Sequence, residues 1–157
     1  LRIASEDIGM AEPNALRMVL SVREAFTVMG MPEGDLALYQ AAVYLACAPK
    51  SNALYVSEMK TKQLIVRTGT PPVPLTIRNA PTRLMAELGY AEGYIYAHDD
   101  PAGALDLEYL PAGLGGEVLY VPRSEGFEKR VKEIMDARAK AKRDRAGAYR
   151  RASGKKG

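Results

Sequence analysis

The clearest pattern in the sequence is a run of apolar residues at helical spacing between residues 11 and 30. The positions follow three- and four-residue steps, with Arg23 as a polar interruption, which places them on one side of an α-helix. Proline fits the first turn of a helix, and glycine often follows the last turn. The segment has both signals, Pro13 and Gly30, around the apolar residues Leu16, Val19, Leu20, Phe26 and Met29. The pattern therefore predicts a helix that ends at Gly30.

Two further helices are predicted on either side of the stretch APKSN, residues 48–52. The first, about 33–47, ends before Pro49, because proline disfavours helical angles in the residue that precedes it. The second, 51–68, begins at Ser51, whose hydroxyl suits a helix N-cap. Small side chains along the first helix would let another helix approach closely: Ala37, Ala41, Ala42 and Ala46. Residue chemistry favours a tight structural corner at APKSN. It leaves open whether the alanine face packs within the subunit or between subunits.

The whole pattern predicts an all-α, mainly helical fold. Short helices are expected at 1–8 and 81–88, each followed by a glycine. A long helix is expected at about 125–146, with Ser124 as its cap and the last ten residues of the chain frayed. Between the last two helices, a segment of 33 residues rich in Gly, Pro and Tyr predicts irregular structure. Within that segment, GYIYAH and EVLYV are candidate strands of a short β-hairpin.

Composition narrows the class of protein. The 157 residues include 47% hydrophobic and 26% charged residues, as in one ordinary globular domain. No apolar run approaches the ~20 residues of a membrane-spanning helix, and no signal-like leader opens the chain, so we expect a soluble, unexported protein without a membrane partner. A single cysteine, Cys47, excludes an internal disulfide. The chain opens at Leu1 within a helical pattern, which predicts a piece of a longer protein.

The charge is distributed unevenly along the chain. Residues 129–157 hold twelve Lys and Arg residues against three acids, whereas the rest of the chain has a net charge of −6. A cluster of cations can bind nucleic-acid phosphates and release their counterions, although a basic helix end is also a common solvated face. The candidate nucleic-acid contacts are Arg138, Lys140, Lys142, Arg143, Arg145, Arg150 and Arg151.

Histidine beside carboxylates is the first candidate for chemistry. His98 precedes Asp99 and Asp100, and such a group can act as a general base or a metal ligand. The sequence offers no second histidine, so a turn residue is the favoured interpretation. A thiolate–imidazole pair between Cys47 and His98 is a further alternative. Cys47 lies in an alanine-rich helical run, however, where cysteine usually packs as a small apolar residue.

Two other patterns are weaker still. The glycine-rich GLGGE, residues 113–117, is not followed by the Lys and Ser or Thr of a phosphate-binding loop, which favours a turn. Four loop acids could bind a cation but lack the spacing of a calcium loop: Asp99, Asp100, Asp106 and Glu108. We therefore predict no catalytic, cofactor or metal site in this chain.

Four stretches, in order, resemble a known family. They are RIASEDIGMAEPNAL (2–16), MGMPEGDLALYQAAVYLACAPKSNALY (29–55), VPLTIRNAP with ELGYAEGYIYAHDDPAGA (73–81 and 87–104), and YLP (109–111). Together they are similar to the C-terminal part of the MgsA/RarA family, the replication-associated recombination proteins of the AAA+ clamp-loader clade, which are related to the eukaryotic Werner helicase-interacting protein. The sequence departs from the family pattern at Glu12, Thr76 and Ala97, none of which is a catalytic position.

The resemblance implies a division into three regions and a role in assembly. Residues 1–10 would end a helical lid, 11–128 would form an oligomerisation domain that builds homotetramers, and 129–157 would form a basic helix and tail. ATP and Mg would be bound by a parent ATPase module absent from this chain. The implied partners are DNA and single-strand-binding protein, in the rescue of stalled replication forks within the bacterial cytoplasm and nucleoid. The alternatives are a nucleic-acid-binding module that uses the basic arm and, less favoured, an enzyme that uses His98 with Asp99.

Overall fold

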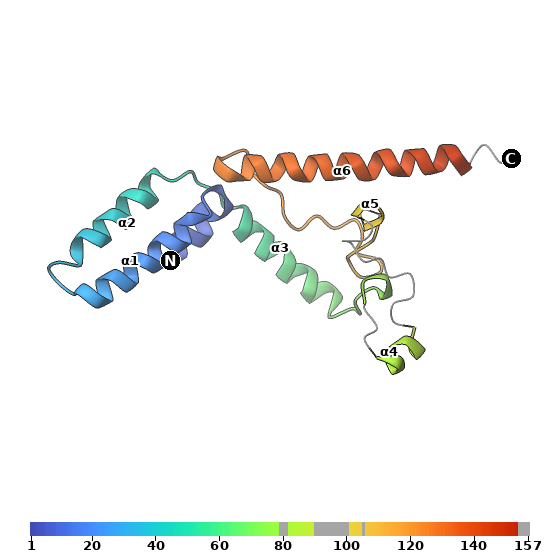
Figure 1. Cartoon of the computed structure of the whole chain (residues 1–157), viewed down its shortest axis with the longest axis horizontal. Helices are drawn as coiled ribbons and strands as arrows, with labels where there is room; N and C mark the ends of the chain where they lie inside the picture. Colours follow the sequence, from blue (N-terminus) through green and yellow to red (C-terminus); the bar gives the residue numbers. More distant parts are fainter. Residues whose placement is uncertain (79–81, 90–100, 105, 154–157) are drawn as a thin grey trace. The chain divides into compact units, whose positions relative to one another are not determined.

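A computed structural model describes residues 1–78, 82–89, 101–104 and 106–153. Within these residues every regular element is helical, as predicted (Figure 1). Residues 117–121, one of the two candidate strands, form no strand, and GYIYAH lies outside the described residues. The chain divides into two compact units, Leu1–Leu64 with Leu119–Met135 and Ile65–Val118 with Asp136–Gly157.

The first unit contains the helical hairpin predicted from the apolar pattern. Its elements are η1 (Ala4–Ile8), η2 (Gly9–Ala11), α1 (Asn14–Met29), α2 (Asp35–Cys47) and most of α3 (Ala53–Thr68). The long helices α1 and α2 run side by side in Figure 1 and pack against each other. Gly30 ends α1 with φ of 68°, a left-handed conformation that glycine adopts without a steric penalty. The predicted boundaries of both helices are confirmed to within a few residues.

A small core holds η1 against the hairpin. Ile8 is fully buried with Ala4 and Ala15, and the partly buried residues Val19, Tyr44, Leu45 and Ala48 pack around them. The alanines have no side chain beyond Cβ, so η1 lies close to both long helices. Ile8 is consequently the one large apolar side chain in the buried centre of this cluster.

The second unit, taken by itself, contains the end of α3 and three short helices: η3 (Leu75–Ile77), α4 (Arg83–Glu87) and α5 (Pro101–Ala104). The proline-rich residues 70–78 form no long element and contain the short turn η3. The helix α5 was not predicted. Two ion pairs tie distant parts of this unit together, Arg67 with Glu117 and Arg145 with Asp106.

The last helix, α6, extends over Gly126–Ser153, longer than the predicted 125–146. The expectation that the final ten residues fray is therefore wrong for the first six of them, which are helical. Alanine, arginine and lysine have high intrinsic helix propensity, and the end of α6 is composed mainly of these residues. This propensity accounts for a helix that continues to Ser153.

Candidate functional site

After Asp35 the helix α2 has no charged residue on any side, and α1 covers only one side of it. Ala41 is buried on the covered side, with 8% of its surface exposed. On the opposite side Leu36, Tyr39 and Val43 are 76%, 70% and 63% exposed. Residues at this spacing share one helical face. We call this face the outer stripe of α2; its exposed residues are Leu36, Tyr39, Gln40, Val43, Ala46 and Cys47.

The alanines of α2 do not form one packing face. Ala41 is buried and Ala37 is partly buried, whereas Ala42 and Ala46 are exposed. The sequence left open whether the alanines pack within the subunit or between subunits. Ala37 and Ala41 lie on the side of α2 that packs within the subunit. Ala42 and Ala46 lie on the uncovered side, where their small side chains leave a low surface.

A shallow groove runs along the outer stripe. It is lined by Met18 of α1 and by Leu36, Tyr39, Gln40, Val43 and Tyr44 of α2. Its walls carry no carboxylate, amine, imidazole or thiol, and their only ionisable groups are the phenols of Tyr39 and Tyr44. Gln40 is the only side chain in the groove with an amide, and Tyr39 and Tyr44 add hydroxyls. The groove suits an apolar partner that brings few charges.

The APKSN corner is held by hydrogen bonds from residues distant in sequence. The backbone N–H of Ser51 donates to the carbonyl of Asp7 at 2.8 Å. The Ser51 hydroxyl accepts the N–H of Ala53 at 3.2 Å, which confirms that it satisfies a donor at the start of α3. The helix begins at Ala53, two residues after the predicted position. The Lys50 amine also donates to the carbonyl of Leu45, near the end of α2.

The carboxylate of Glu128 is the acceptor that completes this corner. It is fully buried in the first turn of α6. One oxygen accepts the Ser51 hydroxyl at 2.6 Å and the N–H of Arg123 at 2.8 Å, and the other accepts the Tyr120 hydroxyl at 2.7 Å. Three donors and the positive end of the helix dipole stabilise this charge. Burial, then the hydrogen bond to Glu128, raise the pKa of Tyr120 well above its ordinary value.

Gly126 allows α6 to begin directly against the corner. A Cβ atom at this position would lie 2.1 Å from the carbonyl oxygen of Ala11 and 2.7 Å from Cγ of Pro49. Gly126 also has φ of 50°, which other residues rarely adopt. No larger side chain fits here unless the backbone moves. The corner is therefore a structural joint between three segments, and its polar groups are used in packing rather than presented to a ligand.

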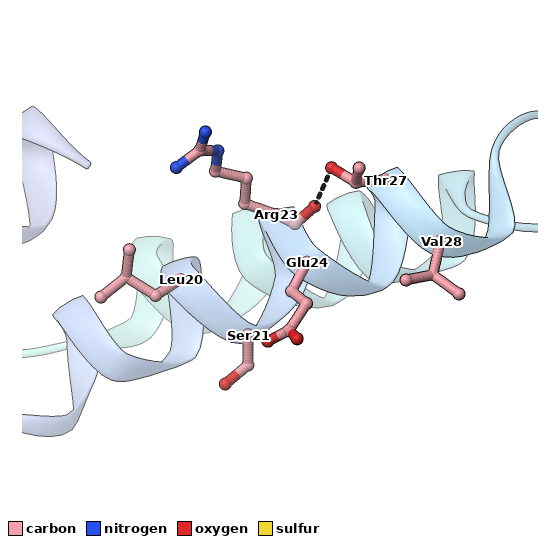
Figure 2. A pocket seen from close by; sticks show the side chains of 6 residues that line it. All are labelled: Leu20, Ser21, Arg23, Glu24, Thr27 and Val28. Carbon is pink, nitrogen blue, oxygen red and sulfur yellow. Dashed lines mark hydrogen bonds between the residues drawn. The ribbon is translucent and has the colours of Figure 1, made fainter.

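A second hollow lies on α1 alone (Figure 2). All six side chains that line it project from this one helix: Leu20, Ser21, Arg23, Glu24, Thr27 and Val28. The hydrogen bond drawn there joins the Thr27 hydroxyl to the Arg23 carbonyl at 2.8 Å and stays within the helix. Side chains from a single helix form an open surface, not an enclosed site for catalysis.

The predicted nucleic-acid contacts lie on α6. Arg138, Lys140, Lys142, Arg143 and Arg145 all have exposed side chains, while the side chains of Arg150 and Arg151 lie outside those that the structure describes. The spacing distributes them around the helix. Arg145 donates to one oxygen of Asp106 from Nε at 3.0 Å and from Nη2 at 2.8 Å. This hydrogen bond and the charge of Arg145 lower the pKa of Asp106.

The weaker chemical candidates gain no support. His98, Asp99 and Asp100 lie outside the described residues, so the histidine hypotheses stay untested. In GLGGE the backbone turns through bonds from Leu114 to Pro111 and from Glu117 to Leu114, each 3.0 Å, as expected for a turn. The described residues contain no group of three or more potential metal ligands. None of the described helices combines the length and apolar character that crossing a bilayer requires.

Sequence reasoning missed the three features that organise the first unit: Glu128, Gly126 and the outer stripe of α2. Glu128 follows Ser51 by 77 residues, and no local pattern relates the two. The outer stripe had a signal in the sequence, because no charged residue occurs between Asp35 and Lys50. A helix without a charged face indicates cover on more than one side.

Comparison with known proteins places the chain in a family. A family model described as "MgsA AAA+ ATPase C terminal" matches residues 1–139. Replication-associated recombination protein A of Coxiella burnetii is 47% identical over 137 residues, which cover 87% of this chain and 31% of that protein. The protein of the same name from Escherichia coli K12 is 42% identical over 136 residues, 86% of this chain and 30% of that protein.

A eukaryotic relative matches as well. ATPase WRNIP1 of Dictyostelium discoideum is 39% identical over 122 residues, which cover 76% of this chain and 14% of that protein. The chain spans less than a third of the length of the relatives described here. The matched region includes the helical hairpin, the corner and the first half of α6. The resemblance predicted from the sequence is confirmed, and the chain belongs to the family of MgsA AAA+ ATPase C-terminal regions.

Proposed function

We propose that this chain is an oligomerisation domain that assembles a homotetrameric AAA+ ATPase with a role in replication-associated recombination. The observation that carries the proposal is the outer stripe of α2, where Leu36, Tyr39 and Val43 are 63–76% exposed. Burying a large apolar side chain contributes about 1.5–3 kcal/mol, so an uncovered stripe of this kind favours association. Obligate interfaces between subunits resemble a hydrophobic core divided in two.

The lining of the groove on α2 supports the same proposal. It is mainly apolar and has no carboxylate, amine, imidazole or thiol, and the hollow on α1 is open. The chain contributes assembly and no active site. ATP and Mg are bound by another part of the parent protein, which hydrolyses ATP in response to DNA. It acts in the cytoplasm and nucleoid, beside single-strand-binding protein, in the rescue of stalled forks.

The first test is the native mass of the chain by light scattering after size exclusion, over a series of concentrations. A tetramer that dissociates only on strong dilution is the expected result. A monomer at every concentration would overturn the assembly role. The same preparation is assayed for ATP hydrolysis, and turnover by this chain alone would overturn the claim that it has no active site.

A second function, nucleic-acid binding by the basic part of α6, is supported by the five exposed cationic side chains between Arg138 and Arg145. Each phosphate contact that a protein makes steepens the fall of affinity with salt. Replacing Arg138 and Lys140 by Gln should weaken retention of single-stranded DNA and flatten its salt dependence. Arg145→Gln is the matched control and should have a smaller effect, because Arg145 already contacts Asp106. Equal retention by all three proteins at low salt would exclude this function.

A further inference from the structure

The outer stripe of α2 changes in side-chain size from one end to the other. Its first residues, Leu36 and Tyr39, are large, whereas its last residues, Ala46 and Cys47, are small. Val43, between them, is intermediate in size. A helix with this gradient packs best against a surface whose gradient runs in the opposite direction, because close packing requires large groups to face small ones.

A second copy of the same helix, lying antiparallel, has that opposite gradient. Related by a two-fold axis near the middle of α2, it would place Leu36 opposite the partner's Cys47. It would also place Tyr39 opposite the smaller Val43 of the partner. A two-fold interface uses the same patch on both subunits, so a single self-complementary stripe is sufficient.

The lack of charge on the outer stripe also favours a second copy of this chain as the partner. The chain has no charged residue from Leu36 to Pro49, so the stripe offers no counterion to a charged partner. A partner that brought Lys, Arg, Asp or Glu would leave that charge desolvated and unpaired. The uncharged stripe of a second copy avoids this penalty. The groove between Met18 and Val43 is open to receive an aromatic side chain such as the partner's Tyr39.

We propose that α2 pairs with α2 of a second copy of this chain, antiparallel about a two-fold axis, with Leu36 against the small end of the partner's stripe. The inference rests on the proposed assembly role and adds the surface and the orientation. The pair is one interface of the tetramer, and a second surface joins two such pairs.

Cysteine pairing tests the orientation directly. The chain has one cysteine, so Leu36→Cys creates a protein with thiols at both ends of the stripe. Within one helix these positions are eleven residues, about 16 Å, apart, which excludes a bond inside one subunit. Diamide takes up the two hydrogens that two thiols lose, and the expected product is a covalent dimer on a non-reducing gel.

Three controls make this result specific. The double variant Leu36→Cys, Cys47→Ser and the wild-type chain should both stay monomeric on the gel, because the antiparallel register keeps like positions about 16 Å apart. Val28→Cys, on the exposed side of α1, should also give no dimer. Dimers formed by the wild type or by the double variant would overturn the antiparallel register, because each has a thiol at one position only and this register keeps like positions apart.

A charge on the stripe gives an independent readout. Leu36→Asp should at least halve the native mass and raise the dissociation constant of the pair at least about 30-fold, the effect of losing a hot-spot residue. Val28→Asp is the matched control, since Val28 is 80% exposed and Leu36 is 76% exposed. It should leave the native mass unchanged. Circular dichroism should show the same helix content for both variants, because neither site is buried.

The outcomes separate the inference from the proposed function. A monomeric wild-type chain would overturn both. An oligomeric wild type that is insensitive to Leu36→Asp and gives no Leu36→Cys dimer would overturn the inference alone. In that case another surface would perform the assembly.

Discussion

At the scale of single residues, the buried carboxylate of Glu128 organises the first unit. Glu128 is fully buried and accepts hydrogen bonds from Ser51, Tyr120 and the backbone of Arg123. In an enzyme such a group would be a candidate acid or base. Here each oxygen is already used by donors of the same unit, and the corner that it completes is packed. Its role is therefore structural.

Replacing this carboxylate should destabilise the fold in proportion to the hydrogen bonds that are lost. Glu128→Ala leaves three donors without an acceptor and should lower the free energy of unfolding by about 3 kcal/mol. Glu128→Gln is the matched control. It keeps one acceptor oxygen for Ser51 and Arg123, and the Tyr120 hydroxyl can rotate to accept the amide, so the loss should be about 1 kcal/mol. Urea unfolding measures both, and equal losses would contradict this account.

The raised pKa of Tyr120 predicts a loss of stability at high pH. A folded-state pKa above the unfolded value of about 10 means that the folded protein favours the neutral phenol. The stabilisation is therefore complete below pH 10 and is lost as the pH rises above it. Tyr120→Phe lacks this ionisation. It should be the less stable protein at pH 8, and its deficit should shrink between pH 10 and pH 11 in urea unfolding. A constant difference over this range would contradict the assignment.

At the scale of elements, helix ends followed from the sequence and helix contacts did not. Proline and glycine act on their own neighbours, so Gly30 and Pro49 predicted the ends of α1 and α2 correctly. The contact of α6 with the corner depends on residues that are far apart in sequence. The helix α5 was missed because its four residues carry no periodic pattern. The end of α6 was misjudged because the helix propensity of its Ala, Arg and Lys residues was not weighed.

Gly126 tests the contact between α6 and the corner. Gly126→Ala should lower the free energy of unfolding by more than about 3 kcal/mol, since the new Cβ would overlap the carbonyl of Ala11. Gly30→Ala is the matched control. Gly30 also has positive φ, at 68°, but no atom lies within 4 Å of the added Cβ, so only the backbone penalty of about 1–2 kcal/mol applies. Thermal unfolding compares them, and similar losses would mean that the close contact is unimportant.

At the scale of the whole molecule, exposed apolar surface is the main feature. Among the residues that the structure describes, few large hydrophobic side chains are fully buried, while many on α1, α2 and α3 are exposed. The sequence predicted that this chain is helical and to which family it is similar, and both predictions are confirmed. It could not predict which apolar face stays uncovered, because a periodic pattern identifies apolar faces without showing what packs on them.

Assembly through such a surface should make stability depend on concentration. Subunit association stabilises the folded state by mass action, so the unfolding temperature should rise by several degrees between 2 and 200 µM protein, taken as roughly a hundredfold span. Differential scanning calorimetry at both concentrations measures this shift. Leu36→Asp should abolish it, and Val28→Asp should preserve it. An unfolding temperature that is independent of concentration for the wild type would count against assembly.

The distance in sequence between Ser51 and Glu128 has a consequence for synthesis. The ribosome synthesises Ser51 first and Glu128, which accepts the Ser51 hydrogen bond, 77 residues later. Until then the Ser51 hydroxyl has no buried partner, and η1 and α2 meet without the start of α6. A nascent chain halted after α3 should therefore be cleaved readily by proteases at APKSN. A chain that has emerged from the ribosome as far as Glu128 should be protected. The first unit closes only after the ribosome has also translated Ile65–Val118, the first segment of the second unit.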